Sequence, residues 1–241
     1  MRKIISMSLA WGVLLIPVAG YSAVIPYQLE TTSIIEQRNF VTVNPQQQLF
    51  PSGLTIAASF NYDNGVSPDG IQPNSNATLY SLNVSNVNVA MSGVYSASSS
   101  YGHTFVSNDG FTPTGSSVSY DALWVFVNPF PATPPLVSLG PQVYDGEGEL
   151  FYLHDIRFTW LENFSGIDFL DDESLPIGLT SPLPDGVLLV FKPVDSLSTA
   201  GQHIVLGPVT SINVVPLPAA AWLMISALGS LGLLGVRRRV L

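Results

Sequence analysis

The sequence predicts an all-β protein, specifically an antiparallel β-sandwich of the jelly-roll type. Short stretches rich in β-branched and aromatic residues recur through the middle of the chain, separated by Gly, Pro, Asn and Asp. Away from the two ends, no long stretch repeats apolar residues at helical spacing. Many short strands without helices between them favour two packed antiparallel sheets. We expect these strands to form one domain over residues 24–213.

Six stretches carry the strand pattern: Leu54–Phe60, Thr78–Val89, Ser117–Val127, Phe151–Leu161, Val187–Lys192 and His203–Val215. Phe151–Leu161 alternates with a period of two. This alternation predicts a core face with Tyr152, Ile156, Phe158 and Trp160, and a solvent face with Asp155, Arg157 and Thr159. The proline-rich residues 128–141 are expected to form a long loop within the same domain.

The first 23 residues have the pattern of a secretory signal. Arg2 and Lys3 precede an apolar run from Ile4 to Ala19, and small residues follow as far as Ala23. A charged start, a short apolar helix and a small-residue end are typical of a peptide that is removed on export. We therefore expect a signal helix over residues 1–23, cut within residues 20–23.

Residues 214–241 have the pattern of a membrane-directed tail. Ala219–Val236 carry no charge, and a helix of that length spans about 27 Å, close to the hydrocarbon core of a bilayer. The cluster Arg237, Arg238 and Arg239 follows and is expected to stay cytoplasmic, so the domain before it is expected on the other side of the membrane. Pro216 and Pro218 favour extended backbone before the helix, where another protein can grip the chain.

This tail resembles the PEP-CTERM sorting signal in its VPLPA variant. The likeness consists of the motif, the apolar helix and the arginine cluster, and the motif residues are Val215, Pro216, Leu217, Pro218, Ala219 and Ala220. The commonest form of the motif has glutamate where this chain has Leu217. Proteins with this signal are exported substrates of exosortase, a membrane-embedded, cysteine transpeptidase-like enzyme of Gram-negative bacteria. The resemblance implies exosortase as a partner and an intermediate in the inner membrane with a periplasmic domain. It also implies a final place at the cell surface or in an exopolysaccharide or biofilm matrix.

Composition excludes several kinds of chemistry. The chain has no cysteine, so disulfides, thiolate metal sites and cysteine nucleophiles are excluded. No G-x-S-x-G, H-E-x-x-H, G-x-G-x-x-G or P-loop motif occurs, and the three histidines are isolated. Between the two ends only Arg38, Arg157 and Lys192 are basic, against 17 acidic residues, which argues against a nucleic-acid partner. We therefore expect a non-enzymatic exported protein.

Two acidic loops are candidate calcium sites. One contains Asp145, Glu147 and Glu149, and the other contains Asp168, Asp171, Asp172 and Glu173. Calcium takes six to eight oxygen ligands in tolerant geometry, which such loops can supply. Neither loop follows the EF-hand pattern, so solvated acidic surface is the alternative, and no other cofactor is expected.

Two alternative functions stay open. A carbohydrate-binding module would stack sugars on aromatic side chains, for which the candidates are Trp124, Tyr144, Tyr152 and Trp160, although aromatics on alternating strands usually belong to a core. A glycan-acting enzyme would need two facing carboxylates, which spacing in sequence does not reveal. His154 falls on the apolar face of its expected strand and is interpreted as a core or rim histidine.

Overall fold

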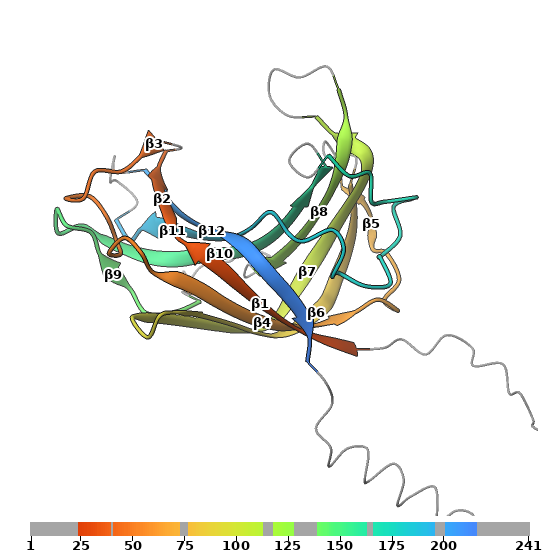
Figure 1. The fold of residues 1–241 in the computed structure, drawn as a ribbon, viewed down its shortest axis with the longest axis horizontal. Helices are drawn as coiled ribbons and strands as arrows, with labels where there is room; N and C mark the ends of the chain where they lie inside the picture. The colour runs from red at the N-terminus through yellow and green to blue at the C-terminus, as the bar shows by residue number, and fades with distance from the viewer. Residues whose placement is uncertain are drawn as a thin grey trace, which may run out of the picture.

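The computed structural model describes residues 24–39, 41–72, 77–112, 118–127, 139–162, 166–195 and 201–215. The signal helix expected over residues 1–23 and the membrane helix expected over residues 219–236 lie outside this part of the chain. Within it, antiparallel strands form the whole framework (Figure 1). The predicted all-β, antiparallel class is therefore confirmed.

Some strands alternate buried and exposed positions, whereas others are buried along most of their length. The strands are β1 (Val24–Ser33), β2 (Ile35–Arg38), β3 (Val41–Thr42), β4 (Thr55–Asp63), β5 (Gly70–Gln72), β6 (Ala77–Met91), β7 (Tyr95–Phe111), β8 (Tyr120–Val127), β9 (Val143–Tyr144), β10 (Leu150–Leu161), β11 (Gly186–Pro193) and β12 (His203–Val214). All six predicted strands are present as β4, β6, β8, β10, β11 and β12, with ends shifted by a few residues.

The sheet closes on itself, so the expectation of a two-sheet sandwich is wrong. Its order β1-β4-β6-β7-β8-β10-β11-β12 returns to β1, because β1 pairs with both β4 and β12. Tyr27 of β1, for example, lies opposite Phe60 of β4 and Val214 of β12. Register shifts interrupt six of the pairings, including β6 with β7 and β10 with β11. Such bulges bend and twist strands, which lets one sheet curl into a closed eight-stranded barrel.

Aromatic and branched side chains fill the barrel. The ring centroids of Phe60 and Phe158 lie 4.8 Å apart, and those of Tyr27 and Phe60 lie 5.6 Å apart. The largest fully buried side chains are Trp160, Tyr27, Tyr62, Phe60, Phe151, Phe158 and Phe191. Each buried side chain of this size stabilises the fold by about 1.5–3 kcal/mol relative to exposure, so the interior is a packed core.

A bulge in β10 changes which residues face the core. The register with β11 shifts between Leu153 and Asp155. Phe151 and Leu153 therefore belong to the core before the bulge, and Ile156 belongs to it after the bulge. Tyr152 is buried but lies outside the core cluster, because it alternates with Phe151 and Leu153. The sequence pattern placed it on the core face, and that face is wrong because strict alternation ignores the extra residue.

Two irregular segments cover the ends of the barrel. The first cap, residues 43–54, carries buried Val43, Leu49 and Phe50 and lies at the end where β2 meets β12. The second cap, residues 166–185, carries buried Leu170, Leu175 and Leu179 and lies at the end where β1 begins and β12 finishes. Apolar side chains from both caps therefore complete the core.

Candidate functional site

The chain enters and leaves the described barrel at one corner. Val24, at the start of β1, lies opposite Asp63, and Val214, at the end of β12, lies opposite Tyr27 (Figure 1). The amide of Val215 still donates a hydrogen bond of 2.8 Å to the carbonyl of Pro26. Val215, the first residue of the predicted sorting motif, is thus held against the barrel. The other motif residues and the arginine cluster lie outside the described residues.

Tyrosine hydroxyls hold the second cap over this end of the barrel. The Tyr27 hydroxyl accepts from the amide of Leu179 at 3.0 Å, and the Tyr62 hydroxyl donates to the carbonyl of Pro176 at 3.0 Å. Burial raises the pKa of both tyrosines above the ordinary value. The hydroxyls therefore stay protonated at neutral pH, and the cap stays bonded.

A cluster of carboxylates lies at the same end. Oxygens of Asp109, Asp121 and Glu162 lie within 4.8 Å of one another. Asp121 is 1% exposed; its two oxygens accept from the amides of Asp109, Phe169 and Leu170 at 2.8–3.0 Å. These bonds fix the carboxylate in place, and an oxygen-only donor set of this kind suits a hard cation such as calcium.

The carboxylates of Asp109, Asp121 and Glu162 are joined by a fourth carboxyl group, that of Asp168. A hydrogen bond from Asp168 to Asp121, and the negative charge of Asp121, raise the pKa of the Asp168 carboxyl above its ordinary value. No ion pair joins the cluster to a basic side chain among the described residues. Sequence reasoning singled out Asp168 but missed the other three residues. They lie on separate elements, and no short motif links them.

The first predicted acidic loop is gathered around an arginine. Arg38 lies 3.7 Å from Asp145, 3.4 Å from Glu147 and 3.5 Å from Glu149. Asp145 also accepts from the amides of Glu147 and Glu149 at 3.0 and 2.8 Å. The three carboxylates are brought together as predicted, but Arg38 supplies positive charge that a bound cation would otherwise provide. This arrangement favours an ion-pair network.

The second predicted acidic loop belongs to the second cap, at the other end of the barrel (Figure 1). Asp172 accepts from the amide of Ser174 at 2.7 Å, and hydrogen bonds from Ser174 lower the pKa of Asp172. Glu173 accepts from the hydroxyl of Thr78. Asp171 is exposed beside them. The structure therefore ties this loop to β6 and keeps it apart from the first acidic loop.

The four predicted stacking aromatics do not form one platform. Trp160 lies in the core, with its indole N–H donating to the carbonyl of Pro182 at 3.2 Å, and Tyr152 is buried. Tyr144 is 66% exposed, on β9. Trp124 is half-buried on β8 and belongs to a different group of rings.

That group is an outer aromatic row on β7 and β8, formed by Phe105, Phe111, Trp124 and Phe126. Edge-to-face contacts join Phe105 to Phe126 at 5.1 Å, and Phe111 to Trp124 at 5.4 Å. The guanidinium of Arg157 lies 4.9 Å from the centroid of the Phe126 ring. The Nε and Nη2 of Arg157 already donate to Asp155 at 2.6–3.0 Å, so the half-buried rings offer mainly a stacking surface to a sugar.

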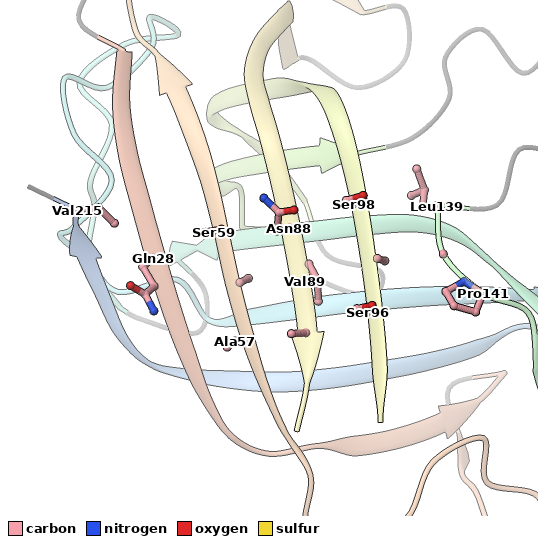
Figure 2. A pocket seen from close by; sticks show the side chains of 14 residues that line it. Gln28, Ala57, Ser59, Asn88, Val89, Ser96, Ser98, Leu139, Pro141 and Val215 are labelled. Carbon is pink, nitrogen blue, oxygen red and sulfur yellow. The ribbon is translucent and has the colours of Figure 1, made fainter. Parts of the chain in front are cut away.

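A groove of about 780 Å³ runs over the outer face of β1, β4, β6 and β7 (Figure 2). Small side chains line its floor: Ala57, Ser59, Asn88, Ala90, Ser96 and Ser98. Gln28 and Val215 border it on one side, and Leu139–Pro141 on the other. None of its lining residues carries a charged or aromatic side chain, so it offers hydrogen bonds without an acid–base pair.

The histidines lie on three different strands. His203 of β12 is fully buried, with Nδ1 2.7 Å from Glu36, and His103 of β7 is 7% exposed. His154 lies in the β10 bulge, with Nε2 3.1 Å from Nζ of Lys192. The bulge turns His154 away from the apolar face expected from sequence, while half-burial agrees with a rim position.

These features define a class of protein: a closed antiparallel barrel with capped ends, whose chain enters and leaves at one corner. Searches against known protein families, curated proteins and solved structures found no match in any of the three. Over the residues that the structure describes, no helix is long and apolar enough to cross a membrane.

Proposed function

We propose that this chain is a non-enzymatic exported protein that an exosortase sorts through the inner membrane and cuts near Pro216–Pro218. The barrel is then displayed at the cell surface or in the extracellular matrix. The motif, apolar run and arginine cluster of the tail support the sorting step, and the signal-like first 23 residues support export.

Both ends of the described chain lie at one corner of the barrel, and this placement gives the proposal its strongest support. Val24 begins β1 and Val215 directly follows β12, and these two strands pair to form the seam of the barrel. A signal peptide before Val24 and a membrane helix after Pro218 can therefore occupy the same bilayer while the barrel folds on one side. A fold with its ends on opposite sides would have to stretch chain around the domain.

Processing can be followed with antibodies against the barrel in a host that contains an exosortase. We expect the full chain to lose its tail, and mass spectrometry to find a mature C-terminus within or near Val215–Pro218. A double variant, Pro216→Ala with Pro218→Ala, should retain the tail. Pro51→Ala, at an exposed proline in the first cap, is the matched control. If a chain ending at Val215 fractionates and matures like the full chain, the sorting role is wrong.

The outer aromatic row favours a second candidate, binding of matrix polysaccharide. Its half-buried rings resemble the aromatic surfaces on which sugars stack. Trp124→Ala should weaken retention on purified exopolysaccharide several-fold, whereas Tyr144→Ala, at an exposed tyrosine on β9, should leave it unchanged. A clean negative for the unaltered barrel across exopolysaccharides would exclude this candidate.

A further inference from the structure

The link between barrel and membrane is short. The Val215 amide is bonded to Pro26, and the apolar segment begins at Ala219, so only Pro216–Pro218 connect them. Four fully extended steps from Val215 to Ala219 span at most about 14 Å. The headgroup layer on one side of a bilayer takes up about 6 Å of that distance. A barrel that still carries its tail therefore lies against the headgroups.

The corner that faces the bilayer is apolar at its tip. Ile177 of the second cap is 85% exposed, Val24 is 55% exposed and Val214 is 48% exposed. Ile177 lies beside the chain ends, because its carbonyl accepts from the side-chain amide of Asn64, which follows the Val24 partner Asp63. We define Val24, Ile177, Val214 and Val215 as the terminal corner. Exposed branched side chains gathered at one tip favour insertion into an interface.

The charged side chains near the terminal corner determine which lipid headgroups this corner can contact. Asp63 is the β4 partner of Val24, and exposed Asp171 and Asp172 lie on the second cap, at the same end of the barrel. Two of the three basic residues of the domain lie elsewhere, Arg38 on β2 at the far end and Lys192 opposite Tyr152 on β10. Anionic headgroups would repel such a surface, whereas zwitterionic headgroups would not.

We propose that the terminal corner is a lipid-contact surface, on which the barrel rests against zwitterionic headgroups for as long as its tail is uncut. This inference rests on the proposed function, since it needs the tail to lie in the membrane. It adds a defined orientation, in which Ile177 touches lipid and β3, at the far end, faces the aqueous side.

The absence of cysteine makes the test direct. Ile177→Cys and Val41→Cys place one thiol each at the corner and on β3, where Val41 is 69% exposed. The full chain, labelled with an environment-sensitive fluorophore, is reconstituted into phosphatidylcholine vesicles that carry a headgroup-attached quencher. We expect several-fold stronger quenching at residue 177 than at residue 41. Replacing part of the lipid with phosphatidylglycerol at low salt should reduce the difference.

Each outcome decides a different point. Equal quenching at the two positions, in vesicles with which the protein floats, overturns the lipid-contact surface and leaves the anchoring tail intact. Stronger quenching at residue 41 than at residue 177 overturns the proposed orientation and likewise leaves the anchoring tail intact. A chain that does not float with the vesicles overturns the membrane role of the tail, and the lipid-contact surface with it.

Discussion

Glu36 is expected to be the residue that fastens the first cap. Its carboxylate accepts from the amides of Leu49 and Phe50 at 2.8 and 3.3 Å, and lies 2.7 Å from Nδ1 of His203. Hydrogen bonds to a charged group contribute about 1.5–3 kcal/mol each, and breaking a buried pair costs about 3–5 kcal/mol. Glu36→Gln keeps the shape and one acceptor oxygen, so we expect it to lower the free energy of unfolding by about 3 kcal/mol.

Urea denaturation of residues 24–215 measures this loss, with Glu30→Gln as the control, since Glu30 is an exposed carboxylate on β1. Amide hydrogen exchange at Leu49 and Phe50 should speed up in Glu36→Gln but not in the control, which locates the effect at the first cap. A double-mutant cycle with His203→Gln should give a coupling above about 1 kcal/mol. A loss no larger than that of Glu30→Gln, with unchanged exchange, would refute the reasoning.

Three further predictions follow from the buried and clustered ionisable groups. Burial lowers the pKa of His103 below its ordinary 6.5. The unfolded chain therefore binds this proton first, and the free energy of unfolding should fall as pH drops below 6.5, an effect that His103→Gln should reduce in urea titrations. Burial raises the pKa of Tyr62 above its ordinary 10.0, so its contribution is present below pH 10 and lost above it; Tyr62→Phe should flatten that alkaline loss. Calcium should raise the melting temperature by several degrees through Asp109, Asp121 and Glu162. Asp109→Asn, which tolerates the φ of 50°, should remove the increase, and an unchanged melting temperature on chelation would contradict the site.

Local patterns in the sequence were sufficient for strands with dense β-branched and aromatic residues. Tyr95–Phe111, which forms β7, does not have the predicted strand pattern, because its first half is serine-rich and has no β-branched residue. In that half, Ala97 and Tyr95 reach the core, while Ser96 and Ser98 line the groove. β1 was missed for a similar reason, since Pro26 and several polar residues interrupt its pattern.

Sequence patterns do not predict that the sheet closes into a barrel. Alternation tells which side chains share a face, but not which strands pair, and a barrel and a sandwich share the same alternation. The bulge at Leu153–Asp155 likewise leaves no signature in the sequence, so Tyr152 was placed on the wrong face. Asp109, Asp121 and Glu162 meet only through the pairing of β7, β8 and β10.

The seam between β1 and β12 joins the first strand of the barrel to the last. During synthesis β1 is made early, and its partner from Tyr27 onward is complete only when Val214 has emerged. Until then β1 and β11 each present an edge of unpaired backbone groups, which is a template for aggregation. Contacts of such long sequence separation also form slowly. The nascent chain is therefore most prone to aggregation just before its last strand appears. Any truncation before His203 is expected to leave an open sheet with two unpaired edges that can aggregate.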